Sequence, residues 1–414
     1  MSIPASLCIK CKGRLWCRLP KCPILEKFET HKRQVSLIKG KEFSGTSPPS
    51  VFVSWHNYPN VTIAPLSPPV AEKDADLLDN PQRWFGLPGQ EIIRFRESLI
   101  RSYKKASIYS ASNPSRELSE IQALVMSSKP VQAEFVLEKA PAPRLSFHDT
   151  VAPLGPTAKL ERMHLAENPS IPKKVEYFYN DIDAKALEAV LSLYSKNLPV
   201  HFLHKLLSAG TLGVKKQRRL VPTRYSITAI DSNVSEYLVN EKVKHCQEIS
   251  EFMVFHSEFL HNNFYVLLIP SKWNFEVLEC WLPGGGWAAF AGKNEINIAQ
   301  DHESYTGRKN YAGNVGGAYY AARLAVAEYL CSSNRQATAI VFREIGSENV
   351  MPLGVWVIRE TVRNALTQKP IGFSGLNLAV SYIGAKLKVP MPQYKQKSVL
   401  LDLIKHQKRI SEWY

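Results

Sequence analysis

The sequence lacks any long hydrophobic run. Its 414 residues contain no stretch of about 18 consecutive apolar side chains, the length that a membrane-spanning helix needs. The first residues also lack the apolar core of a signal peptide, because residues 1–7 run directly into cysteines. We therefore expect a soluble cytoplasmic protein with no membrane partner. The hydrophobic share of 45% is ordinary for a globular chain and allows a sizeable core.

Common catalytic signatures are absent as well. The sequence has no glycine-rich phosphate loop of the Walker type, which argues against ATP-driven chemistry. It has no Ser-His-Asp or Cys-His arrangement with a recognisable local signature. It also shows no internal repeat. The sequence does not indicate an oligomeric state.

Positive charge is concentrated at the two ends of the chain. The net charge is +15, of which residues 1–40 contribute +7 and residues 383–414 contribute +5, leaving +3 for the middle. Basic ends of this kind suit a polyanion such as DNA. Solvated tails that keep the protein soluble would have the same composition.

Cysteines are scarce in the body but clustered at the amino end. Four of the seven lie in the first 22 residues, with the spacing C-x2-C-x5-C-x4-C. A cytoplasmic protein rarely uses such a cluster for disulfides, whereas four thiolates suit tetrahedral Zn²⁺. A segment this short needs the metal to hold it together, so the zinc would be structural. An iron–sulfur cluster and a metal-free segment are the alternatives. The predicted ligands are Cys8, Cys11, Cys17 and Cys22.

Secondary-structure patterns predict an α+β fold. Apolar residues recur at helical spacing in residues 88–105, 183–196 and 318–331. Strand patterns outnumber them and do not alternate regularly with helices, which favours a large mixed sheet with inserted helices. Strands are expected at residues 51–55, 133–139, 225–230, 264–269, 275–281, 338–343 and 354–359.

Proline-rich stretches and charge indicate how the chain is divided. A zinc finger over residues 1–25 is expected to lead into a basic linker over 26–50. The α+β body would cover 51–389, and could comprise two subdomains that meet near 140–180. Residues 390–414 would form a tail, with 393–406 acting as a tether.

The last eight residues fit the pattern Q-x-x-(aliphatic)-x-x-(aromatic)-(aromatic), the PCNA-interacting motif. One turn of 3₁₀-like helix places side chains three residues apart on the same side, so that three apolar groups fill one pocket of the partner. The glutamine amide can bind the rim of that pocket. An ordinary helix end whose aromatics pack on the body is the alternative. The residues predicted to contact the sliding clamp PCNA are Gln407, Ile410, Trp413 and Tyr414.

Two basic segments could bind phosphates. One is the run Lys215–Arg219 together with Arg224, since arginine can bind a phosphate through two parallel hydrogen bonds. The other surrounds the glycines at 307, 313, 316 and 317, where backbone N–H groups at a helix start can approach an anion. A solvated loop and a plain turn would explain the two segments equally well. The candidate residues are Lys215, Lys216, Arg218, Arg219, Arg224, Arg308, Lys309 and Arg323.

Carboxylates near predicted strand ends raise the question of catalysis. If they converge, they could bind Mg²⁺ or Mn²⁺ for phosphodiester hydrolysis. Glu276 and Glu279 are three residues apart, so on a strand at most one of them joins such a site. Surface ion pairing is the alternative. The candidate catalytic residues are Asp231, Asp301, Glu303 and Glu344.

Long strings in the body carry a resemblance that the motifs alone do not. With a four-cysteine segment at one end and the clamp motif at the other, the chain resembles the archaeal Nre family of DNA-repair proteins. The resemblance implies a role in repairing DNA damage together with PCNA. Residues 53–56 (VSWH) depart from the glycine- and arginine-containing version of that family. The matching strings are residues 47–53, 58–61, 219–231, 316–323, 335–337 and 352–356.

Three functional hypotheses follow. The first is a DNA-repair factor that binds DNA and is recruited to PCNA by its C-terminal motif. The second is a metal-dependent nuclease or phosphodiesterase that acts on DNA or nucleotides in repair. The third is a non-catalytic bridge between PCNA and other repair proteins.

Overall fold

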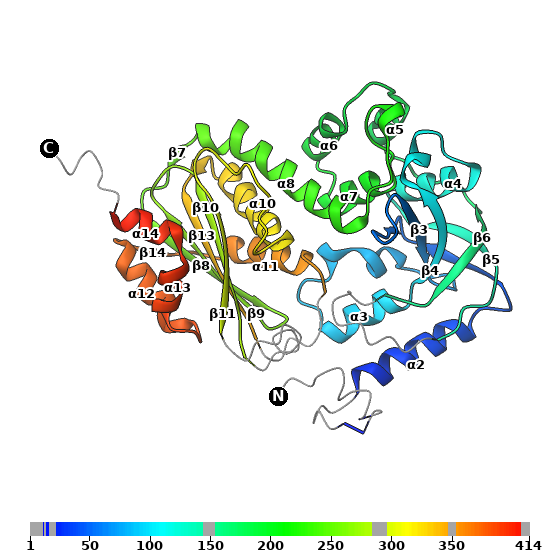
Figure 1. Ribbon diagram of the computed structural model, residues 1–414, viewed down its shortest axis with the longest axis horizontal. Coiled ribbons are helices and arrows are strands. Elements are labelled where there is room, and N and C mark those ends of the chain that lie inside the picture. Colours follow the sequence, from blue (N-terminus) through cyan, green and yellow to red (C-terminus); the bar gives the residue numbers. More distant parts are fainter. Residues whose placement is uncertain are drawn as a thin grey trace. The chain divides into compact units, whose positions relative to one another are not determined.

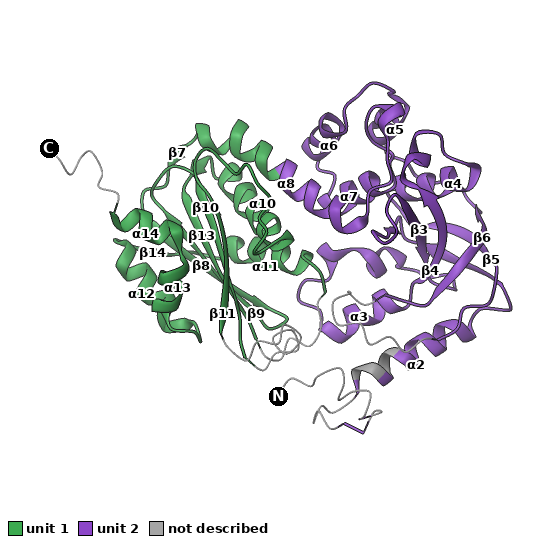
Figure 2. Ribbon diagram, in the orientation of Figure 1, with its two compact units in different colours: residues 1–10, 235–414 green, residues 11–234 purple. Residues whose placement is uncertain are grey.

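The computed structural model describes residues 11, 14–15, 22–143, 154–283, 296–346 and 353–406 (Figure 1). The chain forms two compact units (Figure 2). Unit 2 comprises Cys11–Val234, and unit 1 contains the described residues from Ser235 onward. Within the described part of the chain, no helix is both long enough and apolar enough to cross a membrane.

Unit 2 is built on a six-stranded mixed sheet in the order β1-β5-β6-β4-β3-β2. Strands β4 and β6 are parallel, and every other neighbouring pair is antiparallel. Buried and solvent-facing residues alternate along β5, as expected for a strand with one face on a core. The strands are β1 (Glu42–Ser47), β2 (Val51–Val53), β3 (Asn60–Ser67), β4 (Ile100–Ser107), β5 (Val131–Leu137) and β6 (Thr157–Leu165).

Helices surround this sheet. Helix α4 packs on β6, and α7 packs on β2 and on α4. Short 3₁₀ turns connect the elements. The helical segments are α2 (Pro23–Ser36), η1 (Ala75–Asp79), η2 (Pro81–Arg83), α3 (Gly89–Glu97), η3 (Ile108–Ser112), α4 (Arg116–Met126), α5 (Lys173–Asn180), α6 (Ala186–Ser195), α7 (Val200–Ser208) and η4 (Lys215–Gln217). Helix α8 (Thr223–Glu241) begins in unit 2 and ends in unit 1.

Unit 1 contains a second six-stranded mixed sheet, in the order β11-β10-β13-β9-β8-β14. Only β10 and β13 are parallel neighbours within it. A two-stranded pair, β7 (Gln247–Glu248) and β12 (Arg335–Gln336), is separate. The strands of the large sheet are β8 (Phe252–Phe259), β9 (Asn262–Ile269), β10 (Asn274–Trp281), β11 (Asn297–Glu303), β13 (Thr338–Ile345) and β14 (Ile371–Phe373).

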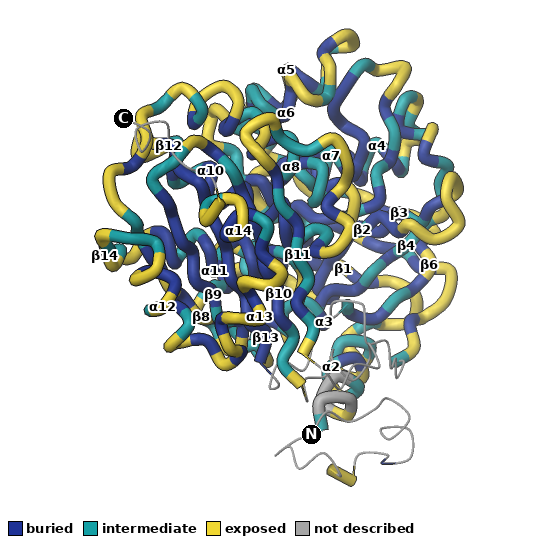
Figure 3. The backbone as a smooth tube through the Cα atoms, turned by 60° about the vertical axis from the view of Figure 1, so that its left-hand side comes forward, coloured by how far each residue is buried: buried dark blue, intermediate teal, exposed yellow. Residues whose placement is uncertain are grey.

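Helices cover both faces of the unit 1 sheet (Figure 1). Helices α10 (Gly317–Ser332) and α11 (Trp356–Thr367) lie on one face. Helices α12 (Leu376–Lys386), α13 (Met391–Lys397) and α14 (Val399–His406) lie on the other, where they share a buried core with β8, β9, β10 and β13. The central strands are therefore buried on both sides (Figure 3). This explains their nearly continuous apolar sequences.

The α+β class is confirmed, but two predicted strands are helices. Residues 225–230 belong to α8, and residues 354–359 mostly belong to α11. Over the whole length of α8, buried positions recur every four residues at 226, 230, 234 and 238, which is a helical period. A six-residue window of β-branched and aromatic side chains was too short to show that period. The helix predicted over 88–105 is α3 only as far as Glu97, and β4 begins at Ile100.

Segments expected to be linkers contain regular structure. The basic segment 26–50 contains most of α2 and all of β1. The segment 393–406 is not a tether, because it forms most of α13 and all of α14. Three of its apolar side chains, those of Tyr394, Leu400 and Leu401, are buried in the unit 1 core. The expected boundary near 140–180 falls inside unit 2, and the units divide at Val234.

A buried carboxylate joins four segments of unit 2. Asp79 at the end of η1 accepts hydrogen bonds from Ser50 and Arg96, and its side chain lies 3.0 Å from Lys205 Nζ on α7. Burial alone would raise the pKa of Asp79, but the charges of Lys205 and Arg96 outweigh it and hold the pKa well below its usual value. The loop between β1 and β2, η1, α3 and α7 are thus held together by one ionised side chain.

Asp79→Asn should lower the free energy of unfolding by about 3–5 kcal/mol, because it leaves the buried Lys205 and the partly buried Arg96 without a counter-charge. The folded pKa of Asp79 is depressed, so its stabilisation is complete above the unfolded pKa of about 4 and is lost as the pH falls towards the folded value. Denaturant unfolding of wild type and variant at several pH values should show the difference shrinking below about pH 4.

Asp74→Asn is the matched control. Asp74 pairs with Arg83 at the surface, where both side chains are well exposed. The control should change stability by less than about 1 kcal/mol. Equal effects of the two substitutions would contradict a special role for Asp79.

Candidate nucleic-acid interface

The predicted basic run lies in unit 2, between α7 and the start of α8. Residues 215–225 carry five Lys or Arg and no acidic residue. Lys215, Lys216 and Arg224 are exposed, whereas Arg219 is half-buried and Arg218 is buried. The segment therefore divides into residues that can reach a ligand and residues that hold the segment in place.

Arg218 belongs to the second kind. Its guanidinium donates to the backbone oxygens of Gly213, Phe178 and Asp181 at 2.8–3.2 Å, and so satisfies carbonyls at the end of α5. Burial lowers the pKa of Arg218 from its usual value. The prediction that Arg218 binds phosphate directly is weakened, because its donors are largely committed to the protein itself.

Backbone hydrogen bonds join the basic run to two distant segments. The N–H of Leu220 donates to the oxygen of Ile108 at 2.9 Å, and the N–H of Ile108 donates to the oxygen of Pro59 at 2.9 Å. The N–H of Val53 donates to the hydroxyl of Thr223, the first residue of α8, at 2.9 Å. The β2–β3 turn, η3 and the start of α8 therefore form one continuous surface.

Aromatic side chains crowd this surface and remain open to solvent. Trp55 is 44% exposed, Tyr58 62%, Tyr109 54% and Tyr225 52%. Single exposed aromatics are common, but a group on joined segments marks an interaction site. We call this group, with its neighbouring side chains, the aromatic–arginine surface; it consists of Trp55, His56, Tyr58, Tyr109, Arg219, Arg224 and Tyr225.

The two arginines of the surface lie against the rings. The guanidinium carbon of Arg219 is 4.5 Å from the centre of the Tyr109 ring, and Nη1 of Arg219 donates to two backbone oxygens that hold it there. The guanidinium carbon of Arg224 is 5.3 Å from the Trp55 ring and 5.5 Å from that of Tyr225. His56 stacks on Trp55 with ring centres 4.2 Å apart. These contacts limit the motion of long cationic side chains beside partly exposed rings.

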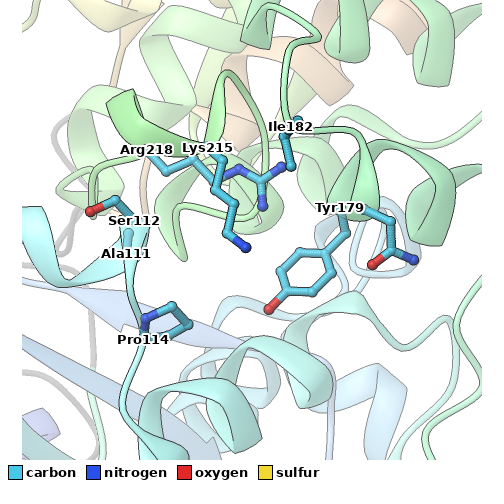
Figure 4. Close-up of a pocket in the computed structure, with 8 residues that line it drawn as sticks. Ala111, Ser112, Pro114, Tyr179, Ile182, Lys215 and Arg218 are labelled. Atoms are coloured by element: carbon cyan, nitrogen blue, oxygen red, sulfur yellow. The ribbon is translucent and has the colours of Figure 1, made fainter.

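A small cavity of about 140 Å³ lies beside this surface (Figure 4). Its lining residues come from the segments 111–114, 179–182 and 215–218, so it shares η3 with the surface and adjoins the basic run. The ammonium of Lys215 and the hydroxyl of Tyr179 point into it (Figure 4). Tyr179 donates to Gln122 at 3.2 Å, which leaves its oxygen able to accept. The cavity combines a cation with a positioned hydroxyl, which suits a small anion such as a phosphate group.

The predicted catalytic carboxylates do not converge. Asp301 and Glu303 on β11 lie opposite Val277 and Phe275 of β10, on the face covered by α10. Glu344 lies opposite Cys280 and belongs to the face covered by α12–α14. Asp231 is buried on α8. Among the residues that the structure describes, no group of three or more His, Cys, Asp or Glu could hold a metal ion. The predicted Mg²⁺ or Mn²⁺ site is therefore not formed by these residues.

Asp301 and Glu303 instead hold the protein together. Asp301 accepts from Arg308 at 3.0 Å and from the N–H groups of Asn314 and Val315 at 2.9 and 2.7 Å. Glu303 accepts from Arg323 at 2.8 Å and from Trp273 at 2.9 Å. Arg308 and Arg323 are thus occupied by internal ion pairs, contrary to their predicted role in phosphate binding. Lys309 is exposed.

Glu344 and Glu276 attach the C-terminal helices to the sheet. Glu344 accepts from the N–H groups of Lys388 and Val389 at 2.9 and 2.8 Å. Glu276 accepts from the N–H of Val399 at 2.7 Å, at the start of α14. Glu276 thus lies at a helix start, where a carboxylate binds amides that would otherwise lack partners and is stabilised by the positive end of the helix dipole, whereas Glu344 binds the connection between α12 and α13. The start of α14 is consequently attached to the unit 1 sheet.

Parts of the predicted terminal sites lie outside the described residues. Of the four predicted zinc ligands, Cys11 and Cys22 are described and Cys8 and Cys17 are not. The predicted clamp-binding residues Gln407, Ile410, Trp413 and Tyr414 are also outside. Both sites remain predictions.

Sequence reasoning found the basic run but missed the aromatic part of the surface. Trp55 and Tyr58 are 169 and 166 residues from Arg224 in the sequence. Their only local signal was a proline turn at Tyr58-Pro59-Asn60. Two of the hydrogen bonds that join these segments run between backbone groups, and the third pairs the N–H of Val53 with the hydroxyl of Thr223; none of them leaves a local sequence signature.

Comparison with known proteins decides the family. The family model described as "Archaeal Nre, N-terminal" matches residues 16–288, and "Archaeal Nre, C-terminal" matches residues 303–413. The chain belongs to the archaeal Nre family. DNA repair protein NreB of Archaeoglobus fulgidus is 36% identical over 394 residues, which cover 95% of this chain and 96% of the relative.

Two further Nre relatives show the same coverage. DNA repair protein NreA of Archaeoglobus fulgidus is 38% identical over 90% of this chain and 92% of its own length. DNA repair protein NreA of Haloferax volcanii is 34% identical over 91% of both chains. No solved structure matches this Nre chain.

Proposed function

We propose that this protein acts in DNA repair, binds DNA through the aromatic–arginine surface and the adjoining lysines of unit 2, and is recruited to the sliding clamp PCNA by its last eight residues. The relatives that are named as DNA repair proteins support a role in DNA repair. The observation that carries the DNA contact is the exposed group of rings and ring-stacked arginines beside Lys215 and Lys216. Cations of this kind bind phosphates, and rings bind bases.

Recruitment to PCNA is supported by the way the chain leaves unit 1. Helix α14 ends at His406, and the clamp motif begins at the next residue, Gln407. Glu276 holds the start of α14, and Leu400 and Leu401 are buried in the core. A clamp bound to this motif would therefore lie within a few residues of a fixed helix, rather than at the end of a long tether.

Removal of Gln407–Tyr414 should abolish PCNA binding, because the motif supplies all three apolar side chains that would fill the clamp's pocket. Binding can be measured by calorimetry with purified PCNA. The melting temperature should stay within about 2 °C of wild type, since the core contacts of α14 are retained. Ser411→Ala, at a variable position of the motif, is the control and should bind PCNA normally. Full PCNA binding by the truncated chain would refute this assignment.

Charge reversal at Lys215 and Lys216 should weaken DNA binding and reduce its salt dependence. Loss of two phosphate contacts lowers the magnitude of the slope of log affinity against log salt by about 1–2 units. Fluorescence anisotropy with labelled DNA over a salt series measures both quantities.

Lys395→Glu with Lys397→Glu is the matched control for that experiment. These exposed lysines lie on α13 of unit 1, and the double substitution changes the net charge equally. It should leave the salt slope unchanged. If both double substitutions weaken DNA binding equally, the effect is one of net charge and the proposed contact is wrong.

A protein that binds PCNA but not DNA would favour the alternative of a non-catalytic bridging protein.

We also propose a structural zinc ion bound by Cys8, Cys11, Cys17 and Cys22. Elemental analysis of purified protein should give about one zinc per chain, and Cys17→Ser should lower that ratio. Iron and a brown colour in the wild-type protein would show an iron–sulfur cluster instead.

A further inference from the structure

The aromatic–arginine surface has features that binding to a duplex would not need. Contact with a duplex backbone requires cations, but the rings of Trp55, Tyr58 and Tyr109 are each more than two-fifths exposed. In a duplex, base faces are already stacked on one another and are inaccessible to a side-chain ring. Exposed ring faces become useful when bases are unpaired, because every base has a flat apolar face that stacks on an aromatic side chain.

Hydrogen bonds hold the backbone that carries Tyr109 and Trp55. Tyr109 belongs to η3, where its N–H bonds to the side chain of Ser107 at 3.3 Å. Trp55 follows directly after Ser54, whose N–H donates to Thr62 at 2.9 Å and whose hydroxyl accepts from Thr62 N–H at 3.1 Å. The backbone at both rings is therefore already ordered before a base binds, which reduces the entropy cost of binding.

Cations lie beside the rings, where they could contact the phosphates of a bound DNA strand. Arg219 lies against Tyr109, and Arg224 lies against both Trp55 and Tyr225. The cavity that contains the Lys215 ammonium and the Tyr179 hydroxyl adjoins η3, the element that also carries Tyr109, since Ala111 and Ser112 line it. A strand with bases on the rings would thus have a phosphate site within reach along its path.

We propose that the aromatic–arginine surface binds single-stranded DNA, with unpaired bases stacked on Trp55 and Tyr109 and a backbone phosphate held by Lys215 in the adjoining cavity. This inference rests on the proposed DNA contact and adds its substrate class. Sequence-independent binding follows, because stacking does not distinguish bases strongly. A repair factor with this property would act where damage or repair has exposed an unpaired strand.

The test compares three ligands with the full-length protein at one salt concentration. They are oligo(dT) of about 16 nucleotides, at the upper end of site sizes for such surfaces, an abasic deoxyribose-phosphate oligomer of equal length, and a duplex of equal length. Oligo(dT) should bind about tenfold more tightly than the abasic oligomer, which keeps the phosphates but has no bases to stack. It should also bind more tightly than the duplex.

Substitutions of single aromatic residues then test where the bases stack. Trp55→Ala and Tyr109→Ala should each weaken oligo(dT) binding about tenfold and leave abasic binding within about twofold. Trp55→Phe should restore most of the loss, because it keeps a ring at that position. Tyr177→Ala on α5 is the control: Tyr177 is 55% exposed and has a lysine over its ring, but it is not part of the surface. All variants should melt like wild type, since the side chains are exposed.

The outcomes separate this inference from the proposed function. Equal affinity for oligo(dT) and the abasic oligomer, or preference for the duplex, would overturn stacking while leaving a DNA contact in place. Equal losses for Tyr177→Ala and Tyr109→Ala would overturn the assigned site. Absence of binding to all three ligands would overturn both proposals.

Discussion

The hydroxyl of Thr223 accepts a hydrogen bond from the backbone N–H of Val53, and the candidate site depends on this contact. It joins the start of α8 to β2, while the N–H groups of Ile108 and Leu220 join η3 to the turn before β3 and to the basic run. These backbone groups need partners once they are buried, so the pairing fixes the three segments together. The exposed rings and arginines are carried on the outside of this junction. Their arrangement is therefore a property of the buried hydrogen bonds beneath them.

Buried carboxylates play a comparable part in unit 1. Strand residues alternate between faces, so that Glu276 and Glu344 are directed towards α12–α14 whereas Asp301 and Glu303 are directed towards α10. Each accepts several hydrogen bonds from a neighbouring element, which offsets the cost of burying its charge. Acidic residues on strands of a DNA-repair family invite a catalytic interpretation. Here their geometry makes them attachment points for helices, and Glu276 and Glu344 anchor the C-terminal helices to the sheet.

The two halves of the Nre family do not coincide with the two compact units. The N-terminal family model extends to residue 288 and includes β8, β9 and β10, whereas the C-terminal model begins at residue 303. Strand β13, from the C-terminal half, lies between β9 and β10 in the unit 1 sheet. Neither half can complete this sheet alone, because β10 would lose β13 as its neighbour. The two family segments are thus expected to fold only as parts of one chain.

Local patterns in the sequence were sufficient for the α+β class, for β5, β9, β10, β13 and α10, and for the basic run at 215–219. These features depend on residue type and spacing over short windows, where burial and helical or strand periodicity leave a direct trace. Tertiary structure decided the rest. Residues 225–230 have the composition of a strand but lie in α8, since the burial that selects a helix repeats over nineteen residues. The partners of Asp301, Glu303 and Glu344, and the meeting of Trp55, Tyr109 and Arg224, depend on contacts between residues far apart in the chain. Such contacts arise from the pairing of distant backbone segments, which no local sequence pattern records.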